Sequence, residues 1–307
     1  MGSVAFVFAG QGAQVPGMGR ELYEQSKAAR EVFDRLEAIR PGTLEMCFNG
    51  STEDLARTIN TQPCLFAVDS ACAAAAVEAG VQADCCAGFS LGEVAAVGFA
   101  GAMSLEDAFR FVVRRGEAMQ ACAEKVSGAM GAVLRLTPDQ VEAICREFPD
   151  QAYPVNYNCP GQTVVACASE IFDALTEKVT AARGRMMRLK VGGAFHTPWM
   201  GDASAELAEY LKDRPLNRTR IPLYANLNAQ PYGENGAELL TKQICNPVRW
   251  QQTIENMIAA GVDTFVELGA GKTLSGLIRK TSADVRVFNV EKAEDIEKLR
   301  EGIVHEG

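Results

Sequence analysis

Residues 84–102 read DCCAGFSLGEVAAVGFAGA, and the fold can be worked out from this stretch. A short apolar run leads into Gly88-Phe89-Ser90-Leu91-Gly92, and a helix-forming segment follows at once. The pattern glycine-x-serine-x-glycine between a strand and a helix is typical of a sharp turn that exposes a serine hydroxyl at the end of a sheet. The next backbone N–H, that of Leu91, then lies at the helix N-terminus. We predict that Ser90 is a nucleophile; the alternative is a plain serine in a glycine-rich turn.

Strands and helices alternate on both sides of this turn. An apolar strand, VAFVF at 4–8, comes first, and TFVEL at 264–268 is a late one. Apolar residues at helical spacing predict helices over 20–39, over 62–79 and from Ser104 onward. Such alternation is typical of a parallel sheet with helices on both faces. The sequence therefore predicts an α/β fold, with an α/β-hydrolase-like large domain around a parallel central sheet.

The middle of the chain has a different order of elements. Two helix-like segments, one opening with a capping box at Thr137 and one capped by Ser169, lie among the strand-like segments GAMGAVLRL, YPVNYN, QTVVACA and RMMRLKV. The order β-α-β-β-α-β is that of a ferredoxin-like unit. We expect this unit to be inserted into the large domain. Residues 1–126 and 195–307 then form the α/β domain, and residues 127–194 form the ferredoxin-like subdomain.

Histidine is scarce, which narrows the search for a base. The chain has 2 histidines: His305 is third from the end, and His196 lies in GGAFHTPWM (192–200), where the chain returns to the large domain. A serine hydroxyl is a weak nucleophile without a base, and the unperturbed imidazole pKa of ~6.5 suits that task. We predict that His196 is the base for Ser90. The alternative is a structural histidine that caps the following helix.

Arg115 is the most informative charged residue. On the helix from Ser104 it shares one face with the apolar residues Ala108, Phe111, Val112, Ala118 and Met119. A buried guanidinium needs a partner, because leaving it unpaired costs several kcal/mol or more. One partner could be Glu93, in a structural salt bridge. The other could be a substrate carboxylate, held by two parallel hydrogen bonds. The helix alone leaves both alternatives open.

Composition narrows the class of protein. The chain has 307 residues, of which 48% are hydrophobic and 22% charged, as in a globular protein large enough for more than one domain. The net charge of −9 disfavours a general nucleic-acid surface, and no run approaches the ~20 apolar residues that span a membrane. The 10 cysteines lack C-x-x-C spacing and mostly lie in apolar runs. We expect reduced thiols, no metal site and, without an evident export signal, a cytoplasmic location.

These residues belong to a longer series of motifs. In chain order they are FVFAGQGAQ with GMG (6–19), TQP (61–63), FSLGE (89–93), RRGEAMQ (114–120), GAM (128–130), VNYNCPGQTVVA (155–166), AFHTPWM (194–200), NPVRW (246–250) and ELGAGKTLSGL (267–277). Together they resemble the malonyl-CoA:acyl carrier protein transacylase family of bacterial fatty-acid synthesis. The resemblance extends over nearly the whole chain.

The resemblance implies a reaction and the residues that carry it. A malonyl group would pass in a ping-pong sequence from malonyl-CoA to Ser90, and then to the phosphopantetheine thiol of acyl carrier protein. His196 would serve as base, and Arg115 would bind the free malonyl carboxylate. No resident cofactor is implied, because the coenzyme A thioester is a substrate. Malonyl-CoA and acyl carrier protein are the implied partners, and neither a nucleic acid nor a membrane is among them.

The resemblance also implies supporting groups. The backbone N–H groups of Gln11 and Leu91 would form an oxyanion hole, and the backbone carbonyl of Arg249 would orient the histidine. Three side chains are candidates for the acyl pocket: Met119, Met130 and Phe195. Ala194-Phe195-His196 resembles the form associated with malonyl-selective members, because a phenylalanine there would crowd a branched α-carbon.

The chain departs from the family pattern at three positions. Phe89 stands where many members have histidine, so a polar neighbour of the nucleophile is absent. Ala270 replaces a common proline, and Cys159 stands where a small polar residue is frequent. None of these changes removes a predicted catalytic group.

Three other functions remain as alternatives. A stand-alone malonyl acyltransferase of a polyketide synthase would have the same site. A serine esterase or thioesterase would have little use for Arg115. A carrier-binding subunit with an inactive site fits poorly with Ser90 and His196 both present. If an acidic carrier protein docks, lysine and arginine residues at 183–190 are candidates for its contact surface.

Overall fold

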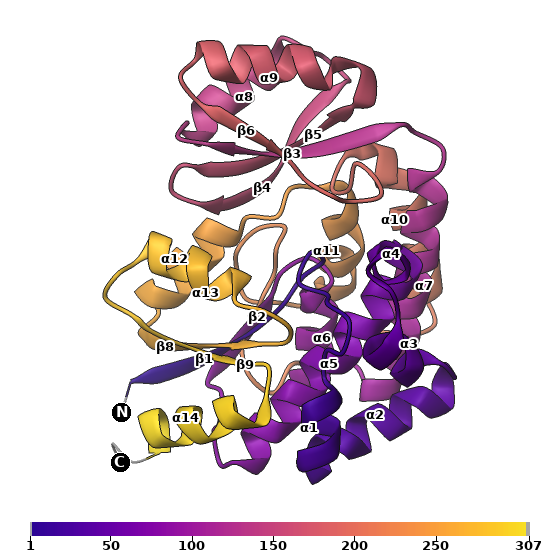
Figure 1. The fold of residues 1–307 in the computed structure, drawn as a ribbon, viewed down its shortest axis with the longest axis vertical. Helices are drawn as coiled ribbons and strands as arrows, with labels where there is room; N and C mark the ends of the chain where they lie inside the picture. The colour runs from indigo at the N-terminus through magenta and orange to yellow at the C-terminus, as the bar shows by residue number, and fades with distance from the viewer. Residues whose placement is uncertain (1, 305–307) are drawn as a thin grey trace.

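The central sheet has five parallel strands in the order β7-β2-β1-β8-β9 (Figure 1). The computed structural model describes residues 2–304, so the second histidine of the chain, His305, lies outside the described residues. In sheet order the strands are Leu223–Tyr224, Cys85–Gly88, Ser3–Phe8, Val262–Leu268 and Arg286–Val290. Every neighbouring pair runs parallel. The predicted α/β fold with a parallel central sheet is confirmed.

Helices cover both faces of this sheet because both faces of its central strand are apolar. In β1, Phe6 and Phe8 pack into the core on one face, while Ala5 and Val7 pack on the other. The first face is covered by α5 (Thr58–Glu78) and α6 (Gly92–Phe99), and α7 (Leu105–Ala123) packs against these two helices. The second face is covered by α12 (Trp250–Ala259) and α13 (Thr273–Thr281).

The predicted helix over 20–39 is in fact two helices, α1 (Arg20–Gln25) and α2 (Lys27–Ile39). Ser26 between them has an extended backbone, and its hydroxyl accepts a hydrogen bond of 3.1 Å from the Ala29 N–H. Ser26 therefore starts a new helix as its N-cap. Outside residues 127–194, the remaining α-helices of the described chain are α3 (Thr43–Asn49), α4 (Thr52–Ala56), α10 (Gly201–Leu211), α11 (Gly236–Lys242) and α14 (Ala293–Val304). Within residues 2–304, no helix has the length and apolar character needed to cross a membrane.

A second, antiparallel sheet has four strands in the order β4-β5-β3-β6 (Figure 1). Its elements follow one another along the chain as β3 (Gly128–Leu134), α8 (Pro138–Arg146), β4 (Ala152–Cys159), β5 (Gln162–Ala168), α9 (Phe172–Ala181) and β6 (Arg185–Arg188). The capping box at Thr137 is confirmed. The predicted cap Ser169 instead begins a short 3₁₀ turn, Ser169–Ile171, and α9 starts only after it.

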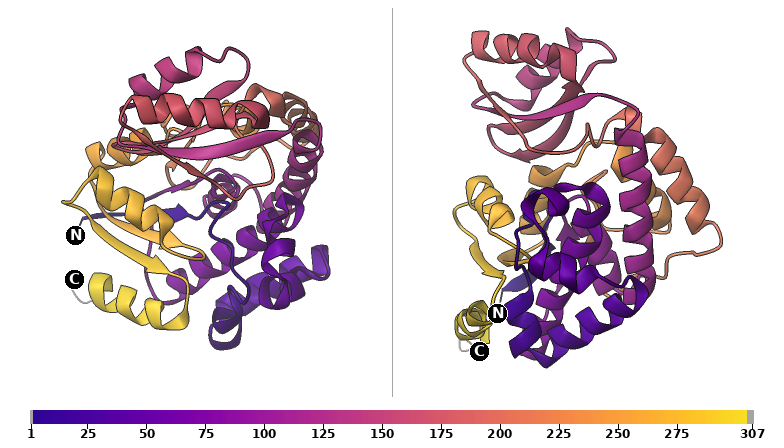
Figure 2. Two further views of the ribbon diagram at one scale, coloured as in Figure 1. Left: turned by 45° about the horizontal axis from the view of Figure 1, so that its top comes forward. Right: turned by 45° about the vertical axis from the view of Figure 1, so that its right-hand side comes forward.

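The small sheet buries its two faces against different partners. Ala129, Val133 and Val165 pack in a core with α8 and α9. Met130 and Ala132, which alternate with them along β3, join the core of the large unit instead. Figure 2 shows α8 and α9 on the far side of the small sheet, with its other face turned toward the large unit. One face of the small sheet is therefore covered only by the large unit.

The turn between β2 and α6 leaves no room for a side chain on its glycines. A Cβ atom on Gly88 would lie 2.0 Å from the carbonyl carbon of Gly92, and one on Gly92 would lie 2.3 Å from the carbonyl oxygen of Phe8. Between the two glycines, Ser90 has a φ of 55°, in the left-handed region that favours glycine. The glycines therefore allow the close approach that holds Ser90 at the end of β2.

This crowding predicts a large effect of Gly92→Ala. The added methyl group would overlap the Phe8 carbonyl, so we expect a loss of about 1–3 kcal/mol or more in the free energy of unfolding. Gly276→Ala is the matched control, because no atom lies within 4 Å of its Cβ position. Inside helix α13 that change should stabilise the protein by about 0.5–1 kcal/mol. Urea denaturation followed by circular dichroism measures both; equal midpoints for Gly92→Ala and the native protein would contradict the crowded turn.

Candidate active site

Ser90 and His196 lie within hydrogen-bonding distance although they are 106 positions apart in the sequence. Ser90 Oγ and His196 Nε2 are 2.8 Å apart. Both residues have a positive φ, 55° and 62° respectively, which the surrounding structure must hold in place. The structure thus brings together the two residues that the sequence predicts as nucleophile and base.

Two amide side chains hold the backbone at Ser90. Asn226 Oδ1 accepts a hydrogen bond of 2.7 Å from the Ser90 N–H, and its Nδ2 donates to the Gly88 carbonyl at 2.6 Å. Gln243 Nε2 donates to the Ser90 carbonyl at 2.8 Å. Both amides come from segments more than 130 positions further along the chain. Sequence analysis missed both residues, because no local pattern joins them to the turn.

The ring of His196 is oriented by a backbone carbonyl, but that carbonyl is not the predicted one. His196 Nδ1 lies 2.9 Å from the carbonyl oxygen of Gln243. A carbonyl only accepts, so Nδ1 carries the hydrogen and Nε2 is free to take a proton from Ser90. The prediction of Arg249 is wrong. As N-cap of α12, its carbonyl accepts from the N–H and hydroxyl of Thr253 at 3.0 and 2.9 Å.

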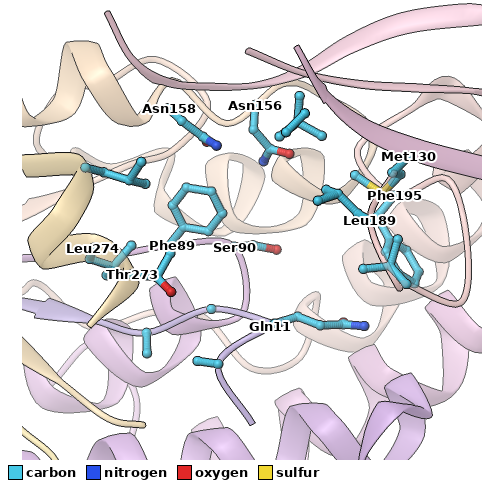
Figure 3. A pocket seen from close by; sticks show the side chains of 18 of the residues that line it. Gln11, Phe89, Ser90, Met130, Asn156, Asn158, Leu189, Phe195, Thr273 and Leu274 are labelled. Atoms are coloured by element: carbon cyan, nitrogen blue, oxygen red, sulfur yellow. The ribbon is translucent and has the colours of Figure 1, made fainter. Parts of the chain in front are cut away.

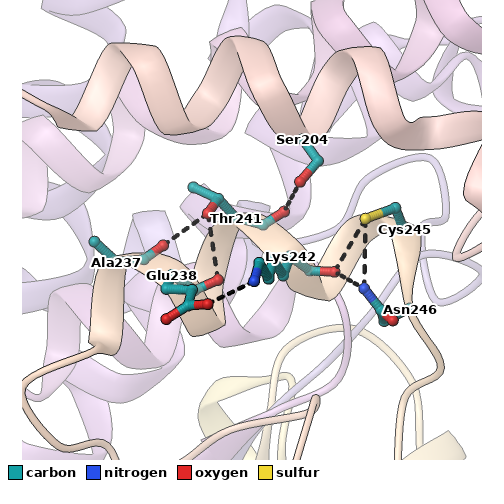
Figure 4. Close-up of polar contacts among 7 residues, drawn as sticks. All are labelled: Ser204, Ala237, Glu238, Thr241, Lys242, Cys245 and Asn246. Carbon is teal, nitrogen blue, oxygen red and sulfur yellow. Dashed lines mark hydrogen bonds and ion pairs between the residues drawn. The ribbon is translucent and has the colours of Figure 1, made fainter.

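The segment that carries Gln243 is tied to its neighbours by backbone-directed hydrogen bonds (Figure 4). It forms a 3₁₀ turn, Gln243–Cys245, directly after α11. Ser204 of α10 donates to the Thr241 carbonyl at 2.9 Å, and Asn246 Nδ2 donates to the Lys242 carbonyl at 2.9 Å. These bonds anchor the two residues directly before Gln243.

His196 is neutral at physiological pH. Burial, and after it the positive charge of Arg115, lowers the pKa of His196 to about 4. Its side chain is only 4% exposed. A neutral imidazole is the form that a general base requires.

Arg115 is buried beside the Ser90 hydroxyl, as its apolar helix face predicts, and is only 1% exposed. Its Nη1 donates to Gln62 Oε1 at 2.6 Å. Its Nη2 donates to Gln243 Oε1 at 2.8 Å and to Ser90 Oγ at 3.2 Å. Its Nε has no hydrogen-bond partner within the described chain. All of these acceptors are neutral, so the guanidinium remains able to pair with an anion beside Ser90.

The alternative partner, Glu93, does not contact Arg115. The Gln243 side chain separates them: its Oε1 accepts from Arg115, and its Nε2 donates to Glu93 Oε2 at 2.8 Å. Within residues 2–304, Arg115 forms no ion pair with a carboxylate. A direct structural salt bridge is therefore absent from the described residues.

Gln62 is a further site residue that sequence analysis did not assign. It is fully buried on α5, in the TQP motif, and its amide oxygen faces Arg115. Its place in the TQP motif, next to Pro63, was the signal that could have identified it. Gln243 had a weaker signal, since it lies three positions before the NPVRW motif.

Of the two residues predicted to form an oxyanion hole, Leu91 directly follows the serine and Gln11 comes from the loop after β1. Gln11 and Ser90 line the same cavity, and Leu91 is the N-cap of α6. In the described part of the chain, neither the Gln11 N–H nor the Leu91 N–H donates to a protein acceptor. Two unpaired donors next to a nucleophile suit a developing negative charge on oxygen.

A cavity of about 370 Å³ is lined by Ser90 and His196, and Figure 3 shows Ser90 among the side chains that surround it. The three acyl-pocket candidates all line it: Met119, Met130 and Phe195. Met130 comes from the small sheet, so the cavity lies between the two sheets. Phe89 also lines the cavity, and its ring meets Trp250 edge-on at 5.4 Å between centroids. The aromatic residue that replaces the family histidine is thus held by packing.

Comparisons with known proteins agree with this geometry. Residues 5–302 match the acyl transferase domain family. The chain is 36% identical over 305 residues to the malonyl CoA-acyl carrier protein transacylase of Bacillus subtilis, covering 97% of this chain and 96% of that relative. The chain belongs to this transacylase family.

Solved members of the transacylase family share the whole fold. The malonyl CoA-acyl carrier protein transacylase of Clostridium perfringens superposes with a TM-score of 0.94 at 36% identity, covering 99% of this chain and 100% of that one. A malonyl-transacylase solved in complex with a type II PKS acyl-carrier protein has a TM-score of 0.94 at 29% identity, covering 98% and 99%. The parallel central sheet and the smaller sheet therefore belong to the transacylase family fold.

The basic residues at 183–190 lie at the edge of the small sheet of this transacylase-family chain. Arg185 and Arg188 are exposed on the edge strand β6. Lys190 is also exposed, and it lines the mouth of the cavity. Of these residues Lys190 lies at the cavity, whereas the guanidinium of Arg188 packs over the ring of Phe172 on α9.

The low pKa of His196 predicts the acid limb of the pH profile. A base must be deprotonated, so kcat/KM for malonyl transfer should rise with pH through about 4, and this acid limb should be complete by pH 6. Steady-state rates between pH 4 and 8, with circular dichroism to confirm folding at each pH, measure this. An acid limb near the ordinary histidine value of ~6.5 would contradict it.

Proposed function

We propose that this protein transfers a malonyl group from malonyl-CoA to the phosphopantetheine thiol of acyl carrier protein, and so supplies fatty-acid synthesis. The observation that carries the proposal is the buried guanidinium of Arg115, 3.2 Å from the hydroxyl of Ser90. An acyl-enzyme that handled only uncharged acyl groups would have no use for a buried cation there. The names of the relatives support the same substrate and acceptor.

In the first half-reaction, Ser90 Oγ attacks the thioester carbonyl while His196 Nε2 takes the hydroxyl proton. The negative charge that develops on the carbonyl oxygen is stabilised by the N–H groups of Gln11 and Leu91. When the tetrahedral intermediate collapses, the carbon–sulfur bond breaks and His196 returns the proton to sulfur. Coenzyme A leaves as the thiol, and the malonyl group remains as an ester on Ser90.

In the second half-reaction the carrier's phosphopantetheine thiol enters the same cavity. His196 takes its proton, the sulfur attacks the malonyl ester, and the proton passes back to Ser90 as the ester bond breaks. Throughout, Arg115 binds the malonyl carboxylate through its two Nη groups. The Gln243 carbonyl keeps the imidazole aligned, a role often filled by a carboxylate, so the site needs no acidic third member.

The shape of the cavity bears on which acyl group enters. Met119 and Met130 are flexible side chains that fill space around a short acyl chain. Phe195, directly before the base, would crowd a methyl branch at the α-carbon. We propose a preference for malonyl over methylmalonyl groups on this basis.

The domain division is also a proposal. Residues 1–126 and 195–307 would form an α/β-hydrolase-like domain, supported by the strand-turn-helix at Ser90. Residues 127–194 would form a ferredoxin-like subdomain, supported by the strand order β4-β5-β3-β6 and the two helices on one face. The polypeptide therefore leaves the large domain once and returns to it directly before His196.

The reaction proposed here uses no resident cofactor or metal, because coenzyme A enters and leaves as a substrate. Among the described residues, no group of histidine, cysteine and acidic side chains could hold a metal ion. A cytoplasmic location is proposed from the cysteines: all ten are free thiols, and nine of them are buried.

A malonyl acyltransferase of a polyketide synthase would use the same groups and differ only in its carrier protein. The esterase or thioesterase alternative is less well supported, because hydrolysis of an uncharged acyl group does not require a buried cation such as Arg115 beside the nucleophile. If the protein is a transferase, it should release free malonate only slowly when no acceptor thiol is present.

Intact-protein mass spectrometry tests the proposed function directly. Native protein mixed with malonyl-CoA should gain one malonyl group, and holo acyl carrier protein should remove it. Ser90→Ala should show no adduct, because the attacking oxygen is gone. An adduct that persists in Ser90→Ala would remove Ser90 from this role, and rapid loss of the adduct to water would favour a hydrolase.

The role of Arg115 is tested by a comparison of two substrates. Arg115→Ala should lower kcat/KM for malonyl transfer about 10- to 100-fold more than for acetyl transfer, which corresponds to ~1.5–3 kcal/mol for a charged hydrogen bond. Arg115→Lys is the matched control, since it keeps the charge and loses the paired geometry. Equal losses on both substrates would indicate a purely structural arginine.

A further inference from the structure

Glu93 is a buried carboxyl group directly beneath the Ser90 turn, and the proposed reaction does not use it. It lies in the first turn of α6 and is fully buried. Tyr232 Oη donates to its Oε1 at 2.6 Å. Gln243 Nε2 and the Asn226 N–H donate to its Oε2 at 2.8 and 3.2 Å. Three donors around one carboxyl group are an arrangement suited to its ionised form.

The same Gln243 amide joins this carboxyl group to Arg115. Its Oε1 accepts from the guanidinium while its Nε2 donates to Glu93. The two charges are thus one amide apart in an interior that water does not reach. The attraction between them lowers the pKa of Glu93 and raises that of Arg115, although burial acts in the opposite direction on each. Glu93 is the counter-charge of Arg115 in the free enzyme.

A substrate carboxylate changes this arrangement. When a malonyl group is bound to Ser90, its carboxylate pairs with Arg115, and a second negative charge enters the buried cluster. Two carboxylates that share one cation in a poorly solvated site do not both remain ionised easily, and the one with the higher pKa takes a proton. The net charge of the site is then the same whether it is empty or loaded.

We propose that Glu93 is a positioning residue for carboxylated acyl groups, ionised beside Arg115 in the free enzyme and protonated when a malonyl carboxylate binds. This inference rests on the proposed function, because it requires the malonyl carboxylate to pair with Arg115. An acetyl group adds no negative charge to the site, so Glu93 does not take up a proton when it binds. Malonyl binding is coupled to proton uptake, and acetyl binding is not.

The other titratable groups around Glu93 do not fit this role. Burial raises the pKa of Tyr232 and that of Cys86 on β2 well above their usual values, and lowers the pKa of Arg115 to about 10. His196 has a pKa of about 4. Burial, partly offset by its hydrogen bonds and by Arg115, raises the pKa of Glu93 to about 7.

Helix α5, which also packs on α6, contributes one buried acid, Asp69. That carboxyl group lies against Gly269 and interacts with Glu267, on the other side of the core. It does not face Glu93. Among the groups that do, Glu93 is the one that titrates near neutrality.

The hydrogen bonds of Glu93 are compatible with its protonation. Tyr232 is the one donor of the three that can also accept, because a hydroxyl does both. On protonation Glu93 can donate to Tyr232 Oη, while Oε2 keeps its bonds from Gln243 and Asn226. Proton uptake therefore leaves the Gln243 link to Arg115 in place.

Proton uptake during acylation tests this inference with the intact enzyme. Transfer of malonyl from coenzyme A to Ser90 releases no net proton, because the serine hydrogen ends on the coenzyme A thiol, which is protonated at pH 7. A pH indicator in weak buffer should therefore report about half a proton taken up per adduct at pH 7, rising toward one at pH 8. Acetyl-CoA should give none. Mass spectrometry of the same samples counts the adducts.

Two variants identify the group that takes the proton. Glu93→Gln keeps the shape and cannot titrate, so its uptake should vanish and its apparent malonyl affinity should be level from pH 6 to 8. In the native enzyme that affinity should fall with rising pH by up to tenfold per unit above about 7. Tyr232→Phe removes a donor to the ionised form, so the uptake profile should move to higher pH.

The outcomes separate the two proposals. No malonyl adduct in the native enzyme means that the proposed function fails. A normal adduct with no proton uptake overturns the role of Glu93 alone. Uptake that persists in Glu93→Gln, or a profile that does not move in Tyr232→Phe, assigns the proton to another group and also overturns it. Tyr232→Phe keeps the test decisive should Glu93→Gln fail to fold.

Discussion

The positive charge of Arg115 is enclosed by protein, and the arrangement of the site follows from the way that charge is accommodated. Removing a guanidinium from water costs several kcal/mol unless polar groups replace the solvent. Here the replacements come from distant parts of the chain: Gln62 on α5, Ser90 after β2 and Gln243 after α11. Each of these elements must reach the same point before the cation is satisfied. The site is therefore assembled only when the large domain is complete.

Gln243 forms hydrogen bonds with each of the principal groups of the proposed site. Its backbone carbonyl orients His196, one end of its amide accepts from Arg115, and the other end donates to the Ser90 carbonyl and to Glu93. A single residue thus sets the relative positions of the proposed nucleophile, base and carboxylate-binding group. Such an amide, with a donor and an acceptor at fixed separation, conveys geometry without adding charge. The backbone carbonyl that orients the imidazole is likewise uncharged, so no neighbouring carboxylate alters the pKa of His196.

Much of this could be predicted from the sequence where the determining interactions are local. Gly88 and Gly92 mark the turn because neighbouring backbone leaves no space for a Cβ, and the period of the apolar residues places Arg115 inside. The orienting carbonyl could not be predicted in this way. Gln243 and Arg249 lie six positions apart near the same motif. Only the three-dimensional path decides which of them faces His196 and which begins a helix. The break at Ser26 was missed because apolar spacing continues across it, although the serine cap ends one helix and starts another.

The small sheet presents one face to its own helices and the other to the cavity, and its side chains alternate between the two. Met130 and Ala132 line the cavity, whereas Ala129 and Val133, which flank them on β3, pack in the subdomain's own core. Substitutions at every second position of β3 can therefore reshape the space offered to the acyl chain while the interior of the subdomain keeps its packing. The lining of the cavity and the interior of the subdomain are thus supplied by two interleaved sets of residues on a single strand. A change of acyl group can therefore arise from a single substitution on β3 that leaves the subdomain's own core unchanged.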